Sequence, residues 1–62
     1  MRLQINMDTG DQAMTFNPKE ELQSLMRQIM EPMANAIRSN IEDRGSIHDS
    51  NGNTIGIWRT MK

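Results

Sequence analysis

The residues that could carry chemistry in this chain are few, and they surround one predicted turn. His48 is the only histidine, and therefore the only side chain that ordinarily titrates near neutral pH. Asp49 follows it directly, but neighbouring residues of a strand point to opposite faces, so the two cannot act as a base and its orienting acid. Ser46 shares a face with His48, but no third residue is in place to complete a catalytic triad. We therefore expect no catalytic residues and no enzymatic activity.

The same turn has part of the spacing of a calcium-binding loop. Asp49, Asn51 and Asn53 match the first, third and fifth positions of such a loop. The sixth position requires Gly and the twelfth requires Glu, but here these positions hold Thr54 and Thr60. The chain also has no cysteine and no glycine-rich phosphate loop. We expect neither a metal site nor a cofactor.

A β-hairpin explains these residues without a ligand. Asp49-Ser50-Asn51-Gly52 is typical of a type I turn followed by a left-handed glycine, in a three-residue hairpin loop. This loop places the three isoleucines of the segment on one face: Ile47, Ile55 and Ile57. It places His48 and Trp58 on the other face, where we expect an exposed binding surface. There Trp58 either shields the backbone of Gly56 or anchors a partner, whereas a register shift of one residue would bury it.

Two further segments must position the hairpin, and the first of them is an N-terminal strand. Residues 2–7 alternate between polar and apolar side chains. This alternation predicts a strand with Leu3, Ile5 and Met7 on its buried face. We expect Met14 and Phe16, in the loop that follows, to cover the core.

The second segment is a long amphipathic helix. Asn17 and Pro18 are typical of a helix start, and Glu20 would complete a capping box. Apolar residues then recur at intervals of three and four. Gly45 is typical of the residue that follows a helix, so we expect the helix to span residues 18–43.

The order strand, helix, strand, strand predicts an α+β fold in a single domain, residues 1–62. In this β-α-β-β fold, a small three-stranded sheet packs on one long, Pro-kinked helix, with the isoleucine-rich last strand in the centre. A chain of 62 residues supports only a thin core, to which seven methionines add apolar volume.

The predicted helix is longer than the sheet. A helix over residues 18–43 extends about 39 Å at 1.5 Å per residue, whereas a six-residue strand spans about 20 Å. The second half of the helix would therefore overhang the sheet. We expect this half to form a partner or dimer interface from four apolar residues: Met30, Met33, Ile37 and Ile41. The alternative is that a kink at Pro32 folds this half back over the core.

Charge and hydropathy limit the other classes of partner. Seven Lys and Arg against eight Asp and Glu give a net charge of −1, and the cations are spread along the chain. Nucleic-acid binding is therefore not favoured, although folding could gather Arg2, Arg59 and Lys62 near one sheet edge. No segment is apolar enough for a secretory signal or a membrane span, so we expect no membrane association and a cytoplasmic location.

Two segments together resemble a known family. The tail GSIHDSNGNTIGIW and the opening LQINMDTGDQAMTF are similar to a family of small uncharacterised proteins of phages, prophages and bacterial genomes. The shared hairpin core has the pattern Asp-x-Asn-Gly-Asn-x-x-Gly, which here is Asp49, Asn51, Gly52, Asn53 and Gly56. The chain departs from the family in its helix, which is longer and contains Pro32.

The resemblance implies a mobile-element origin and no catalytic residues or cofactor. It implies a small accessory protein, located in the host cytoplasm, that binds a host or viral macromolecule. We expect a non-enzymatic homodimer that binds and modulates a host or viral protein. The alternative is a dimeric nucleic-acid-binding regulator in which strands of two copies make a basic surface.

Overall fold

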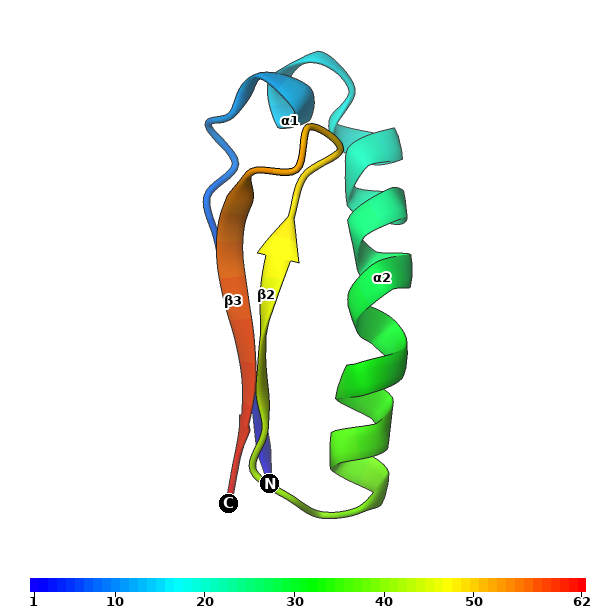
Figure 1. Cartoon of the computed structure of the whole chain (residues 1–62), viewed down its shortest axis with the longest axis vertical. Helices are drawn as coiled ribbons and strands as arrows, with labels where there is room; N and C mark the ends of the chain where they lie inside the picture. Colours follow the sequence, from blue (N-terminus) through cyan, green and yellow to red (C-terminus); the bar gives the residue numbers. More distant parts are fainter.

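Three antiparallel strands and one long helix form two layers, with a short helix at one end (Figure 1). The computed structural model describes all residues from Met1 to Lys62. The elements, in chain order, are β1 (Arg2–Met7), α1 (Gln12–Phe16), α2 (Pro18–Arg38), β2 (Arg44–His48) and β3 (Thr54–Met61). The sheet has the order β1-β3-β2, so the last strand lies in the centre. The predicted α+β fold, a three-stranded sheet packed on one long helix, is confirmed.

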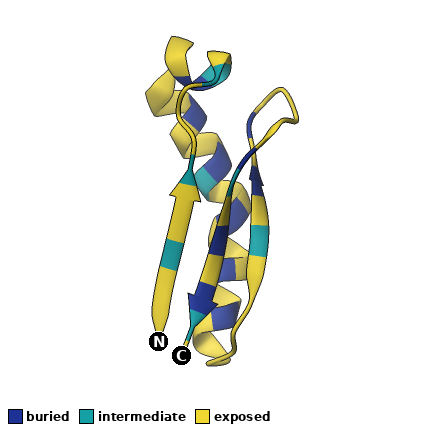
Figure 2. Cartoon of the chain, turned by 90° about the vertical axis from the view of Figure 1, so that its left-hand side faces the viewer, coloured by how far each residue is buried: buried dark blue, intermediate teal, exposed yellow.

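β1 forms over the residues that the alternation predicts, and it pairs with β3 alone. Leu3 lies opposite Thr60 and Ile5 lies opposite Trp58, so these four residues share the face of the sheet that is turned toward α2. We call this the inner face. α2 packs mainly against β2 and β3, and β1 lies to one side of it (Figure 2). Leu3 and Ile5 therefore remain 40% and 37% exposed.

α2 ends at Arg38, earlier than the sequence predicts. Asn40 adopts a left-handed conformation with φ 53°. The N–H groups of Asn40 and Ile41 donate to the carbonyls of Ile37 and Ala36, both at 3.1 Å. This pair of hydrogen bonds is a Schellman motif, which satisfies the last carbonyls of the helix. The prediction that Gly45 ends the helix is wrong because Asn40, which tolerates this conformation better than most residues, ends it first.

The shorter helix does not overhang the sheet but runs along its length (Figure 1). Met33 and Ala36, in the second half of α2, are buried in the core. Pro32 lies inside the helix on its exposed side, and the helix continues through it as one element. The predicted overhang is therefore wrong, and Met33 is a core residue.

α2 begins at Pro18 as predicted, but without the predicted capping box. Asn17 occupies the N-cap position, and its side chain makes no capping hydrogen bond. Instead, the carboxylate of Glu21 is buried and its Oε1 accepts a hydrogen bond of 2.6 Å from the backbone N–H of Ser50. This bond joins the first turns of α2 to the turn between β2 and β3.

The short helix α1 occupies a segment for which the sequence predicts a loop. Met14 is buried, as expected, but Phe16 is 74% exposed. Residues two apart on a helix point about 200° away from each other, so only one of the two can face the core. The prediction that both residues cover the core is wrong for Phe16.

The turn between β2 and β3 has the predicted conformation. The N–H of Gly52 donates to the carbonyl of Asp49 at 3.1 Å, and Gly52 has φ 83°. The N–H of Asp49 in turn donates to the carbonyl of Asn53 at 2.9 Å, which closes the hairpin loop. These bonds fit a type I turn followed by a left-handed glycine.

The pairing beyond the turn differs from the prediction, because β3 contains an additional residue. Ile47 pairs with Gly56, but His48 pairs with Thr54, so Ile55 has no partner of its own on β2. Such a β-bulge shifts the alternation of side chains by one position.

The bulge explains why the predicted faces of β3 are exchanged. Ile55 and Trp58 both lie on the inner face and are buried, whereas Ile57 lies on the outer face and is 48% exposed. The prediction that Trp58 belongs to an exposed surface is wrong, since only 3% of it is accessible.

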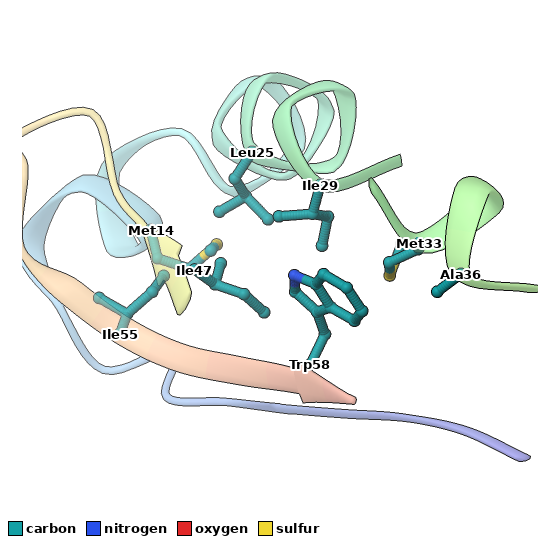
Figure 3. Packing of buried hydrophobic residues seen from close by; sticks show 8 residues of the cluster. All are labelled: Met14, Leu25, Ile29, Met33, Ala36, Ile47, Ile55 and Trp58. Carbon is teal, nitrogen blue, oxygen red and sulfur yellow. The ribbon is translucent and has the colours of Figure 1, made fainter. Parts of the chain in front are cut away.

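Trp58 lies between the sheet and α2, within a core of eight buried residues (Figure 3): Met14, Leu25, Ile29, Met33, Ala36, Ile47, Ile55 and Trp58. Its cross-strand partner on β2 is Gly45. A Cβ atom at position 45 would lie 2.7 Å from Cε2 and 2.9 Å from Cζ2 of the indole ring. Glycine at this position therefore makes the space that the ring occupies.

Replacing Gly45 with alanine tests this packing. We expect Gly45→Ala to lower the free energy of unfolding by about 1–3 kcal/mol, because the new methyl group must displace the indole in a packed core. Ser46→Ala, one residue along on the exposed outer face, is the matched control and should leave stability nearly unchanged. Urea unfolding followed by far-ultraviolet circular dichroism measures both. Equal midpoints for the two variants would contradict the burial of Trp58 against β2.

Candidate functional site

The carboxylate of Asp49, the first residue of the segment with calcium-loop spacing, is hydrogen-bonded within the turn itself. Asp49 is buried, and its Oδ1 accepts hydrogen bonds from the backbone N–H groups of Asn51 at 3.0 Å and Asn53 at 2.8 Å. The side-chain amide of Asn53 lies 3.5 Å from Oδ2. No group of three or more His, Cys, Asp or Glu side chains is arranged to hold a metal ion. The pattern therefore stabilises a hairpin loop.

A second carboxyl group, that of Asp11 at the start of α1, lies against Asp49. Both carboxylate oxygens of Asp11 are shielded from solvent, and no donor of the protein reaches them. A hydrogen bond between the two carboxyl groups requires a proton on one of them. This contact with Asp49, together with burial and the repulsion between the two carboxylates, raises the pKa of Asp11. Burial disfavours ionisation of Asp49, but hydrogen bonds from Asp11, Asn53 and Asn51 outweigh it and lower the pKa of Asp49.

The structure does not bring together the predicted pair His48 and Trp58. His48 is exposed at the end of β2, on the outer face, whereas Trp58 is in the core. The carboxylate of Asp49 is turned into the hairpin loop and does not orient the imidazole. His48 therefore lacks the neighbours of a general base.

Exposed and partly buried apolar residues follow one flank of α2. We call this surface the helix patch and define it by four residues: Leu22, Met26, Met30 and Ile37. Met30 is 58% exposed, Leu22 and Ile37 are also exposed, and Met26 is partly buried against the core. Of the four interface residues predicted from the sequence, Met30 and Ile37 belong to this patch, and Ile41 is exposed just beyond the helix end.

The helix patch lies on the side of α2 that faces β1. Glu21 lies on the opposite flank of α2, where its carboxylate accepts a hydrogen bond from the turn that joins β2 and β3. At 100° per residue, Met26, Met30 and Ile37 lie about 140–180° around the helix from Glu21. β1 is the strand at the other edge of the sheet (Figure 2). The exposed inner-face residues of β1, Leu3 and Ile5, therefore lie on the same side of the molecule as the helix patch.

Sequence reasoning missed Leu3, Ile5 and Phe16 as exposed apolar residues. The alternation in residues 2–7 identifies the apolar face of the strand, but it carries no information on whether a helix covers that face. Leu22 has the same three- and four-residue spacing as the buried residues of α2, so spacing alone does not distinguish it from them. For Leu3 and Ile5, the available signal is that one helix is too narrow to cover three strands.

The outer face of the sheet carries three arginines, one from each strand. Arg2, Arg44 and Arg59 are all exposed. Arg44 and Arg59 are direct cross-strand partners, although like charges in such a position repel. The guanidinium of Arg59 donates a hydrogen bond of 2.8 Å to the neutral side chain of Gln4. Folding thus gathers on one face cations that are dispersed in the sequence.

In comparisons with known proteins, the chain matches no family model, no curated protein and no solved structure. Neither helix combines the length and the apolar character that crossing a bilayer requires.

The carboxyl pair makes stability depend on pH. Because the pKa of Asp11 is raised from 3.8, its contribution is full below that value and is lost as the pH rises through the folded-state pKa. Because the pKa of Asp49 is lowered, its contribution is present above 3.8 and is lost as the pH falls through its folded-state pKa. We expect the pair to contribute most in mildly acidic solution and less at neutral pH.

Asp11→Asn should therefore raise the urea midpoint at pH 7, since the amide donates to Asp49 at every pH. The substitution should also remove the part of the decrease in urea midpoint between acidic and neutral pH that the Asp11–Asp49 pair causes. Asp8→Asn, an exposed carboxyl nearby, is the control and should keep the wild-type pH profile. Parallel profiles for wild type and Asp11→Asn between pH 4 and 8 would refute the shared proton.

Proposed function

We propose that this chain is a small non-enzymatic interaction protein, an accessory factor of a phage or other mobile element, that binds and modulates a host or viral protein. The observation that carries this proposal is the helix patch. Monomeric proteins rarely leave a continuous apolar surface exposed unless a partner covers it. The carboxylate of Asp49, by contrast, is hydrogen-bonded within the turn, and the imidazole of His48 is exposed at the end of β2.

The composition of the helix patch fits a helical or extended apolar segment of another protein. Two of its four residues are methionines, whose flexible side chains adapt to different shapes. Gln23 and Arg27 line the same shallow groove as Leu22, Met26 and Met30. A partner segment with apolar residues toward the groove and an acidic residue at its rim would match both parts.

A second candidate function, binding of nucleic acid by a dimer, is favoured by the outer face of the sheet. Arg2, Arg44 and Arg59 could contact phosphates from that face. No aromatic residue stands there, because Trp58 is in the core, so stacking on bases would contribute nothing. Binding would therefore depend on phosphate contacts and on salt.

Substitution of Met30 tests the first candidate. Against a protein captured from infected host cells, Met30→Glu should weaken binding at least tenfold, because a carboxylate would be buried in an apolar interface. Gln28→Glu introduces the same charge on an exposed position of α2 outside the patch and should bind like the wild type. Titration calorimetry with the purified partner gives the affinities. Equal affinity for the two variants would remove the helix patch as the binding surface.

The second candidate makes a separate prediction for duplex DNA. If it holds, fluorescence anisotropy should show binding at about 50 mM salt that weakens steeply at about 200 mM salt. Arg44→Gln with Arg59→Gln should reduce this binding more than Lys19→Gln with Arg38→Gln, which removes the same charge from α2. Absence of binding at the lower salt concentration would eliminate this candidate.

A further inference from the structure

The inner face of the sheet is covered over two strands, whereas on β1 only Met7 packs partly against the core. Ile5 is 37% exposed, although its partner across the strand pair, Trp58, is buried. Leu3 is 40% exposed beside Thr60, which is buried as well. The apolar layer between sheet and helix therefore does not end at a polar boundary. It continues to Leu3 and Ile5 on β1, a strand that contains no buried residue (Figure 2).

The free edge of β1 lacks three of the features that protect edge strands, namely a proline, a bulge and an inward-pointing charge. Its six residues contain no proline, no glycine and no charged side chain on the inner face. The opposite edge of the sheet, β2, is shorter, contains Gly45 and is interrupted by the irregular pairing at Ile47 and His48. β1 is thus the edge that offers a regular row of unpaired backbone donors and acceptors.

The sequence of β1 is complementary to itself in the antiparallel direction. With a twofold axis at Gln4, Leu3 of one copy lies opposite Ile5 of the other, and Arg2 lies opposite Asn6. Residues that are directly opposite point to the same face, so the four aliphatic side chains form one cluster on the side of both helices. The register also keeps the two Arg2 side chains apart.

We propose that two copies of this chain pair through β1, antiparallel and centred on Gln4, to form one six-stranded sheet. The order of strands is β2-β3-β1 in one copy, continued by β1-β3-β2 in the other. The helix patches of the two copies then face each other across the joined strands. This arrangement differs from the helix-mediated dimer expected from the sequence, because the backbone of β1 supplies the hydrogen bonds of the interface.

The exposed area of the single chain supports a second copy as the occupant. A folded monomer of this mass exposes about 4,100 Å², whereas the chain of 7.1 kDa exposes 4496 Å². Nine large hydrophobic residues are exposed, and two of them, Leu3 and Ile5, lie on this strand. Pairing also satisfies the edge backbone groups along the whole of β1, which a loosely bound apolar segment would leave unpaired.

The oligomeric state and a charge on the inner face test the pairing. In sedimentation equilibrium at about 100 μM, the wild type should have twice the mass of one chain. Ile5→Lys should give monomers, because it places a charge at the centre of the interface. Asn6→Lys, the next residue of the same strand but on the outer face, should remain dimeric. A monomeric wild type, or an Ile5→Lys variant that stays dimeric, would overturn the proposal.

A cross-link keeps the test valid even if Ile5→Lys fails to fold. The chain has no cysteine, so Gln4→Cys introduces one thiol. At the proposed twofold axis the two Cys Cα atoms would be about 4.5–5.5 Å apart, which is within the span of a disulfide. Oxidation should convert this variant to a covalent dimer at least tenfold faster than His48→Cys, whose thiol lies exposed at the opposite edge. Equal rates would overturn the proposal.

The pairing does not depend on the partner-binding role of the helix patch, and the two can fail separately. If Met30→Glu loses partner binding but sediments with the same mass as the wild type, the result bears on the helix patch and not on the pairing of β1. A dimer that persists in Ile5→Lys but dissociates in Met30→Glu would show that the copies meet through α2, which contradicts pairing through β1.

Discussion

A single helix cannot cover a sheet of three strands. An α-helix with its side chains is about 10–12 Å wide, whereas three strands that are about 4.8 Å apart, together with their own width, extend further. α2 packs over β3 and β2, so it covers the inner face of the central strand and of one edge strand and leaves most of the other edge strand open. The small core, the exposure of Leu3 and Ile5, and the position of the helix patch beside them all follow from this mismatch. The helix patch and the free edge of β1 both lie on the side of the molecule that α2 leaves uncovered.

Buried polar groups hold the two ends of the helix to the sheet where apolar contacts are few. At one end, Glu21 accepts a hydrogen bond from Ser50, and the nearby Asp49 organises the hairpin loop. At the other end, the hydroxyl of Thr60 donates to the carbonyl of Ile41 at 2.7 Å and accepts from the N–H of Asp43 at 2.9 Å. These bonds join segments that are distant in sequence. They fix the direction of α2 along the sheet in a chain whose core alone is thin.

The fold class, the bounds of β1, the central position of β3 and the hairpin turn could all be predicted, because each depends on local signals. Alternation identifies a strand, and Asp49 with Gly52 identifies the turn. The faces of β3 could not be predicted, because the bulge at Ile55 depends on pairing with β2 and inverts every later position. The helix end was missed for a related reason: Asn40 and Gly45 are both compatible with a left-handed residue, and tertiary contacts assign Gly45 to the indole ring instead. The candidate surfaces depend on which strands the helix covers, which no local pattern encodes.

The burial of Trp58 also gives the molecule an internal optical reporter. The chain has one tryptophan and no tyrosine, so nearly all of its intrinsic fluorescence originates from a single indole. That indole lies between β3 and α2, packed against Gly45 and directly across the strand pair from Ile5. Its emission wavelength therefore reports the hydration of the core without any label. Ile5, its neighbour across the strand pair, is one of the exposed inner-face residues of β1, so the same signal follows events at the open edge of the sheet.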